Sequence, residues 1–288
     1  MTGTDVAEAY RVCEQITRSQ ARNFHYGIRL LPPQRRAALC ALYALARRID
    51  DIGDGDLSMP EKLRALTAVR DGLRDLPNST DPVLVAVHDA SRRYPLPLPA
   101  FDELVDGVEM DVTGRRYETF DDLVGYCRCV AGTVGRLCLG VFAARADARA
   151  ADYADRLGIA LQQTNILRDI REDLSNGRVY LPQSDLDAYG VELALDERGA
   201  LVDKDGGLAE LVVACAQRAR VWYSEGLRLL PLLDRRSAAC TAAMAGIYHR
   251  LLDRIEQRPQ DVYDRRLSLS GREKAGVAVR ALLGLGTA

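Results

Sequence analysis

The segment Tyr43-Ala-Leu-Ala-Arg47-Arg-Ile-Asp50-Asp-Ile-Gly-Asp54 decides the fold, because it closes a long apolar stretch that follows Pro32-Pro33. Proline fits the first turn of a helix, so we expect a helix from these prolines to about Ile52, ended by the glycines that follow. A polar stripe on an apolar helix lowers stability unless it lines a cavity or meets solvent. Residues spaced by 4, 3 and 4 positions form such a stripe here: Tyr43, Arg47, Asp50 and Asp54.

A second segment, Gln162-Gln-Thr-Asn165-Ile-Leu-Arg168-Asp169-Ile-Arg-Glu-Asp173, repeats this pattern near the end of a helix expected over Ala148 to Leu174. Spacings of 3, 4 and 4 again place polar residues on one face: Gln162, Asn165, Asp169 and Asp173. We interpret the two stripes as facing walls of one pocket.

Each stripe ends in an Asp-x-x-x-Asp pair, whose carboxylates share a helix face and can approach one cation. Both pairs lie in last turns, where the helix dipole disfavours negative charge by about 0.3 to 1 kcal/mol. Hard oxygen ligands suit Mg²⁺, particularly when phosphate oxygens complete its shell. Arginines suited to a diphosphate lie among the acids: Arg47, Arg48, Arg168, Arg171 and Arg178. The predicted metal ligands are Asp50, Asp54, Asp169 and Asp173.

The remainder of the chain also predicts helices. Capping boxes at Ser58 and Ser270 open two of them, and further helices are expected over Thr119 to Ala144, Leu208 to Leu230 and Asp234 to Glu256. No alternating β-branched run occurs, and Val179-Tyr180-Leu181 ends at a proline and is interpreted as a loop. We therefore predict an all-α fold, one domain over residues 1–288 with about ten helices.

Composition excludes several classes of protein. The 39 Lys and Arg against 41 Asp and Glu give a net charge of −2, so no basic field favours nucleic acid. The longest apolar run has ten residues, too few to span a bilayer, and the N-terminus lacks the pattern of a secretory signal. The seven cysteines have no metal-binding spacing and are expected to be free and mostly buried. The expected location is cytoplasmic, and a greasy product would be compatible with peripheral membrane contact.

With these motifs the sequence resembles the squalene/phytoene synthase family, from about Ser19 to Lys274. Besides the two acidic segments, the resemblance rests on Tyr126-Cys-Arg-Cys-Val130-Ala-Gly-Thr-Val-Gly135 and Gly177-Arg178-Val-Tyr180-Leu-Pro182. Within the family the chain looks most like the presqualene diphosphate synthases of the hopanoid pathway.

The resemblance implies an isoprenoid synthase fold, with helices around a central cavity. It also implies Mg²⁺-dependent, head-to-head condensation of two farnesyl diphosphates to presqualene diphosphate. The four aspartates would hold Mg²⁺, and four tyrosines would flank the reacting carbons: Tyr43, Tyr126, Tyr180 and Tyr248. Side chains expected to bind the diphosphates or line the pocket are Arg22, Asn23, Arg47, Gln162, Asn165, Arg168, Arg178 and Arg266. Ala131 and Val134 are expected in the wall of an apolar tunnel for the prenyl tails.

One departure from the family concerns two N-terminal serines, which appear here as Ala21 and Asn23. Asn23 can still form a hydrogen bond to a diphosphate, whereas Ala21 cannot, so Arg22 would have to replace the first serine. Related enzymes that convert presqualene diphosphate to hydroxysqualene carry a similar Asn-Phe pair, so that reaction stays open.

Three further alternatives remain. A phytoene or dehydrosqualene synthase would share every motif and differ in chain length or later steps. A ferritin-like protein would need Glu-x-x-His pairs, which are missing. A non-catalytic assembly factor would have lost the aspartates, and all four are present.

Overall fold

The computed structural model describes residues 3–21, 23–142 and 147–284. Their α-helices are α1 (Gly3–Gln20), α2 (Phe24–Ile28), α3 (Pro33–Asp54), α4 (Met59–Arg74), α5 (Pro82–Arg93), α6 (Pro99–Val112), α7 (Phe120–Cys127), α8 (Thr133–Val141), α9 (Ala150–Ser175), α10 (Gln183–Ala188), α11 (Gly207–Gly226), α12 (Arg235–Gln257), α13 (Asp261–Asp264) and α14 (Gly271–Leu282). Ten of these helices have nine or more residues. The all-α class is confirmed: in the described ranges the sole β-type pairing is an isolated bridge between Leu195 and Leu201.

The predicted helix starts are confirmed by their hydrogen bonds. The Ser58 and Ser270 capping boxes are both formed, and Thr119 forms a third with Asp122. At α5 the Asp81 side chain accepts from the amides of Val83 and Leu84. Each cap satisfies amides that a first turn would otherwise leave unpaired, so these residues set where the helices begin.

The helical stretch expected over Thr119 to Ala144 is present from Phe120 to Val141, but it is not one regular α-helix. A π-helical turn, Arg128–Gly132, separates α7 from α8, and the end of the expected helix lies outside the described residues. Close packing explains the π-turn: a Cβ on Gly158 of α9 would lie 2.3 Å from the Ala131 carbonyl oxygen, and one on Gly107 of α6 would lie 2.5 Å from Val130. The backbone is clamped there between α6 and α9.

The helix expected to reach Leu230 is also shorter than predicted, because α11 ends at Gly226. A Cβ on Gly226 would meet the Leu157 backbone at 2.5 Å, so α11 and α9 touch at this point. The chain continues as a 3₁₀ helix, Leu227–Leu232, which contains Pro231.

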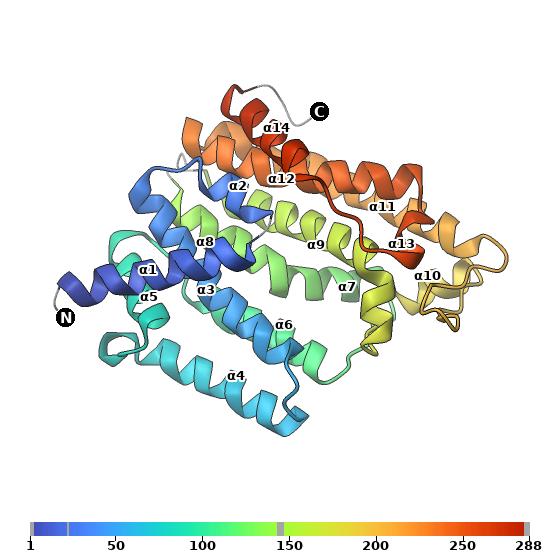
Figure 1. Cartoon of the computed structure of the whole chain (residues 1–288), viewed down its shortest axis with the longest axis horizontal. Helices are drawn as coiled ribbons and strands as arrows, with labels where there is room; N and C mark the ends of the chain where they lie inside the picture. Colours follow the sequence, from blue (N-terminus) through green and yellow to red (C-terminus); the bar gives the residue numbers. More distant parts are fainter. Residues whose placement is uncertain (1–2, 22, 143–146, 285–288) are drawn as a thin grey trace.

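The long helix α9 runs through the middle of the molecule, with α11, α12 and α14 on one side and α3 and α6 on the other (Figure 1). One apolar cluster joins α1, α3, α5 and α6, and a second joins α9, α11 and α12. Between them, the C-terminal ends of α3 and α9 carry the two acidic segments.

Two sequence-based exclusions agree with the structure. No helix in the described ranges is both long and apolar enough to cross a bilayer. The seven cysteines are free, and five of them are buried.

Candidate functional site

The ends of the two acidic segments are joined through Arg178, whereas a pocket between the two stripes stays a prediction. Arg178, three residues after α9, donates through its guanidinium to Asp54 Oδ1 at 2.8 Å and to the Gly53 carbonyl oxygen at 3.2 Å. Its backbone N–H donates to the Asp173 carbonyl oxygen at 2.8 Å. One residue therefore ties the last turn of α3 to the last turn of α9, and its positive charge offsets the clustered acids.

Asp50 and Asp173 are half-buried carboxylates without a hydrogen bond or ion pair in the described part of the chain. Burial, followed by the neighbouring charge of Asp54, raises the pKa of Asp50 to about 7. Burial and the charge of Asp169 likewise raise the pKa of Asp173 to about 7. The charge of Asp111 adds to the rise at both positions. Both groups face one acidic region where an incoming cation would release their protons.

Asp111, near the end of α6, belongs to the site, although the motifs did not indicate it. Its carboxylate accepts from the Tyr180 hydroxyl at 2.7 Å and from the Tyr126 hydroxyl at 2.9 Å. Burial raises the pKa of Asp111, against the lowering effect of these hydrogen bonds. The rings of Tyr126 and Tyr180 stack with centroids 5.1 Å apart, and Tyr117 packs against both.

The other two predicted tyrosines form a separate aromatic group. Phe24 of α2 packs between them, with centroids 6.3 Å from Tyr43 and 6.0 Å from Tyr248. Burial raises the pKa of Tyr43 to about 12, so its phenol stays protonated at neutral pH. The four tyrosines thus form two groups, and Tyr180 is the one that lies in a loop rather than on a helix. The charge of Asp50 acts on Tyr43, and that of Asp173 acts on Tyr180.

Besides Arg178, three more of the arginines expected to hold a diphosphate contact acids of the two segments. The Arg47 guanidinium pairs with Asp51 at 2.5 Å, and its Nε is buried without a partner. Arg168 and Arg266 both bind Asp169, with Nε–Oδ1 distances of 2.8 and 2.9 Å. An anion entering the site would therefore compete with carboxylates for these guanidinium groups.

The polar stripe on α9 holds an amide pair. Asn165 Nδ2 donates to Gln162 Oε1 at 3.3 Å, which leaves Asn165 Oδ1 buried without a partner. A buried, unpaired oxygen costs about 1 to 3 kcal/mol and is an available ligand for a cation. Within the described residues no three His, Cys, Asp or Glu side chains gather closely enough to hold a metal ion alone. A Mg²⁺ ion here would need further oxygens, and a phosphate supplies them.

For the remaining predicted site residues, no hydrogen bond or ion pair links them to the two acidic segments or to the tyrosines in the described part of the chain. Arg22 lies outside the described residues. Asn23 precedes α2 at its N-cap position but makes no side-chain capping bond. Ala131 lies in the π-turn and Val134 in the first turn of α8, and both are half-buried. Their place in a tunnel wall stays a prediction.

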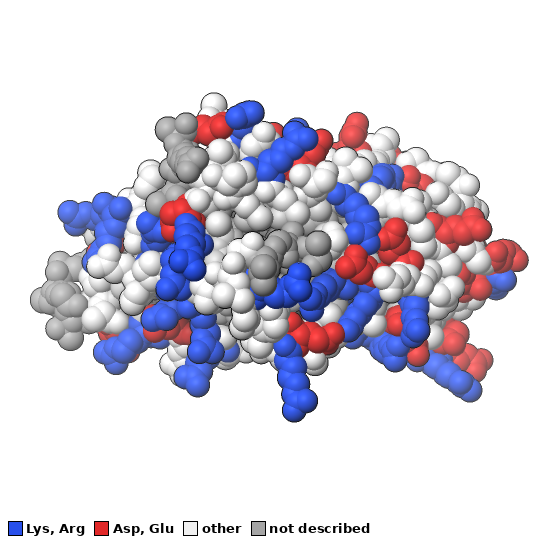
Figure 2. Space-filling view, turned by 90° about the horizontal axis from the view of Figure 1, so that it is seen from above, with Lys and Arg blue, Asp and Glu red and all other residues white. Residues whose placement is uncertain are grey.

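The face of the molecule seen in Figure 2 carries charged side chains of both signs. Figure 2 shows basic and acidic side chains intermingled on the face seen from above, without a continuous field of one sign.

With the site defined, comparison with known proteins identifies its class. The family description "Squalene/phytoene synthase" matches residues 17–273, so the chain belongs to that family. The phytoene synthases of Mycobacterium bovis and Mycobacterium tuberculosis are each 57% identical over 279 residues, covering 97% of this chain and 92% of theirs. The phytoene synthase of Arthrospira platensis is 36% identical, covering 90% of this chain and 88% of its own length.

Solved structures confirm the isoprenoid synthase type of fold. A dehydrosqualene synthase crystallised with a ligand gives a TM-score of 0.86 at 26% identity, covering 98% of both chains. The squalene synthase HpnC from Alicyclobacillus acidocaldarius gives 0.80 at 29% identity, covering 89% of this chain and 96% of its own. The specific likeness to hopanoid-pathway enzymes, expected from the motifs, is not what the curated relatives favour.

Proposed function

We propose that the protein is a phytoene-type synthase that joins two geranylgeranyl diphosphates head to head. The identity of 57% to two phytoene synthases over nearly the whole chain supports this choice over the farnesyl diphosphate reaction expected from the motifs. The observation that carries the catalytic part is the pair of unpaired carboxylates, Asp50 and Asp173, on helix ends that Arg178 ties together.

The two acidic segments would bind the diphosphates through Mg²⁺. Asp50, Asp54, Asp169 and Asp173 would hold the metal, with the unpaired Oδ1 of Asn165 as a further oxygen ligand. When bound, the metal neutralises the diphosphate and favours its departure as a leaving group. Metal binding needs ionised carboxylates, so the raised pKa values of Asp50 and Asp173 make affinity rise with pH up to about 7.

Arginines would orient the leaving diphosphate. Arg168 and Arg266 flank Asp169, and Arg178 lies beside Asp54, so their guanidinium groups border the acids from two sides. Guanidinium forks match phosphate oxygens bidentately and resist deprotonation. Loss of diphosphate from one substrate leaves an allylic cation, and the double bond of the second substrate attacks its C1.

The two tyrosine pairs would surround that cation. Aromatic faces stabilise positive charge by about 0.5 to 2 kcal/mol each. The Asp111 carboxylate fixes the Tyr126 and Tyr180 hydroxyls in place. Burial, followed by the charge of Asp111, raises the pKa of both phenols and keeps them protonated. Loss of one proton from the joined carbons would close a cyclopropane, with the released diphosphate as the base at hand. Departure of the second diphosphate, opening of the ring and loss of a second proton would then give phytoene without a reductant.

A second candidate, presqualene diphosphate formation from farnesyl diphosphate, is supported by the likeness to the squalene synthase HpnC. It uses the same residues with a chain shorter by one isoprene unit. Hydroxysqualene formation would use presqualene diphosphate, the product of this second candidate reaction, as its substrate.

Product analysis separates these functions. The purified chain with Mg²⁺ and no NADPH is supplied with geranylgeranyl or farnesyl diphosphate, and long-chain products are identified by mass spectrometry. Phytoene from the twenty-carbon substrate, with the higher kcat/KM, is the expected result. Presqualene diphosphate from farnesyl diphosphate as the preferred product would favour the second candidate, and no diphosphate release from either substrate would reject both.

A further inference from the structure

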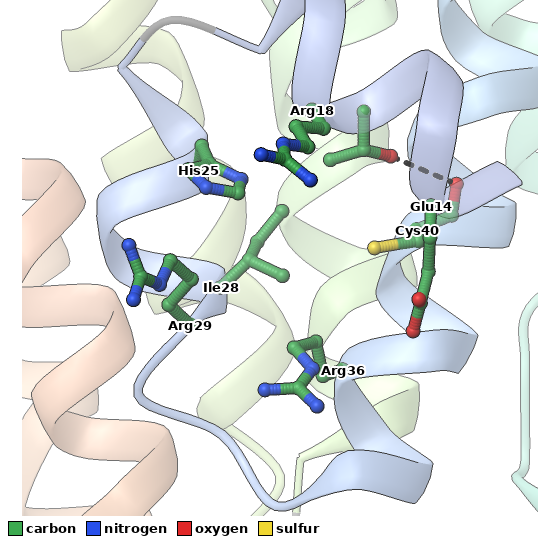
Figure 3. Close-up of a pocket in the computed structure, with 8 residues that line it drawn as sticks. Glu14, Arg18, His25, Ile28, Arg29, Arg36 and Cys40 are labelled. Carbon is green, nitrogen blue, oxygen red and sulfur yellow. Dashed lines mark hydrogen bonds between the residues drawn. The ribbon is translucent and has the colours of Figure 1, made fainter. Parts of the chain in front are cut away.

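A pocket of about 390 Å³ lies between α1, α2 and the first two turns of α3. Its side chains come from α1 (Glu14 and Arg18), from α2 and the residue after it (His25 and Arg29), and from α3 (Arg36). Figure 3 shows these side chains gathered around Ile28. None of them belongs to the two acidic segments.

The pocket holds three guanidinium groups and one carboxylate. Arg18, Arg29 and Arg36 have no ion pair or side-chain hydrogen bond with any described residue. The adjacent Arg35, in contrast, pairs with Asp234 at 2.7 Å. The chain can therefore pair an arginine in this region, and it leaves three of them available.

Their charges converge on one imidazole. The pKa of His25 is lowered by burial and then by the positive charges of Arg29, Arg18 and Arg36. Like charges held together lower stability unless an anion joins them, and a concave basic surface concentrates anions from solution. His25 thus reports a positive potential inside the pocket.

We propose that this pocket binds a phosphate-bearing anion, either a free phosphate or diphosphate or the headgroup of an anionic phospholipid. Three guanidinium forks from three elements match the several oxygens of such a group. The volume exceeds that of a single phosphate and accommodates a diphosphate or a phosphate ester. No residue of the proposed catalytic machinery contributes to it.

The pocket is separate from the acidic site along α3. Arg36 precedes Arg47 by eleven residues, which is about 16 Å of helix. The short helix α2 stands between them, since His25 lines the pocket while its neighbour Phe24 contacts Tyr43 and Tyr248. Binding in the pocket can therefore be measured apart from catalysis.

Proton NMR of the imidazole ring of His25 supplies a local readout, because the chain has three histidines and His25→Gln assigns the signal. The metal-free protein is titrated with inorganic phosphate and with inorganic diphosphate at constant ionic strength. Separate samples contain vesicles of phosphatidylcholine with or without phosphatidic acid. We expect saturable binding that raises the pKa of His25, and about tenfold weaker binding in Arg29→Gln and in Arg36→Gln.

The control is Arg64→Gln, which removes an exposed arginine on α4 that has no ion pair with another described residue. This variant should bind as the wild type does. A response to the soluble anions supports a free phosphate ligand, and a response to phosphatidic acid vesicles alone supports a lipid headgroup. No saturable His25 response to any probe, or equal weakening in Arg29→Gln, Arg36→Gln and Arg64→Gln, would overturn the proposal.

Discussion

Asp155 and Asp50 are both aspartates on long central helices, but their surroundings are opposite. Asp155 of α9 is buried between Arg136 Nε at 2.8 Å and Arg128 Nε at 3.0 Å, and Arg136 also binds Glu103. Asp50 has no hydrogen bond or ion pair in the described part of the chain, and the charges near it are three acids, Asp54, Asp111 and Asp51, against one base, Arg47.

The paired aspartate stabilises the fold, whereas the unpaired aspartate is available to a ligand. The Asp155 network links α6, the π-turn, α8 and α9, so its charges stabilise the packing that interrupts the helix. The acids at the ends of α3 and α9 are left incompletely paired, which lowers stability without a ligand. Matched Asp→Asn substitutions should therefore have opposite consequences in the two regions.

The largest effect is expected on folding at Asp155. Asp155→Asn removes a buried carboxylate that pairs with the largely buried Arg136 and with the exposed Arg128. We expect a loss of about 3 kcal/mol in the free energy of unfolding. Urea denaturation measures this change. Turnover per folded molecule should stay within about twofold of the wild type, since 10²-fold losses accompany removal of a direct stabiliser of the transition state. A stable but inactive variant would place Asp155 in the catalytic site instead.

At Asp50 we expect a large loss of activity and no loss of stability. Asp50→Asn should lower turnover of geranylgeranyl diphosphate at least ~10²-fold, because it removes one electrostatic stabiliser of the departing diphosphate. Its free energy of unfolding should not fall, because the substitution relieves repulsion at a helix end. Steady-state kinetics and urea denaturation test both parts. Near-wild-type turnover would contradict a metal-binding role.

Two tyrosines offer a smaller contrast within one aromatic group. Tyr180→Phe removes the hydroxyl that donates to Asp111 at 2.7 Å, and should cost about 2 kcal/mol of stability. Tyr117→Phe is the control, because the Tyr117 hydroxyl is buried without a partner, and it should be neutral or stabilising. Equal losses in thermal or urea unfolding would show that the hydrogen bond from Tyr180 to Asp111 adds nothing to stability beyond the presence of a hydroxyl group.

The smallest expected effect is on the pH dependence of the free energy of unfolding in metal-free buffer. The Asp50 carboxyl ionises near pH 4 when unfolded and near pH 7 when folded, so the native state binds more protons between these values. Its stabilising contribution is complete below pH 4 and is lost as pH rises through 7. We expect wild type to lose about 1 to 2 kcal/mol relative to Asp50→Asn over this range, allowing for solvent screening of a half-buried group. A constant difference between the two proteins would contradict the raised pKa.

Local periodicity predicted much of this molecule. Spacings of three and four residues placed Asp50 and Asp54 on one face of α3, and Asp169 and Asp173 on one face of α9. Capping residues predicted where several helices begin. Both kinds of inference rest on interactions within one or two turns, which the order of residues determines.

Contacts between helices were harder to predict. Asp111 is recognised only when α6 brings it to Tyr126 and Tyr180, although its spacing from the buried Leu104 and Val108 could have placed it on the inward face. At the π-turn, the Ala131 backbone packs against Gly158 of α9 and the Val130 side chain packs against Gly107 of α6. Such contacts depend on tertiary packing, which a single sequence does not display.

The partners of the arginines were also beyond local inference. Arg47 shares the stripe of Asp50 but pairs with Asp51 instead. Asp169 has two guanidinium partners, so Asp169→Asn would leave Arg168 buried with less compensation and is a poorer probe of metal binding than Asp50→Asn.

The central claim is that the ends of α3 and α9 form one diphosphate site, and a double-mutant cycle tests it most directly. Asp50→Asn, Asp173→Asn and the double variant are compared for Mg²⁺-dependent kcat/KM with geranylgeranyl diphosphate. If both carboxylates serve one bound metal–diphosphate group, the second substitution costs much less than it does alone, with a coupling of about 1 kcal/mol or more. If the fold-losses in kcat/KM of the two single variants simply multiply in the double variant, the two carboxylates do not share a site.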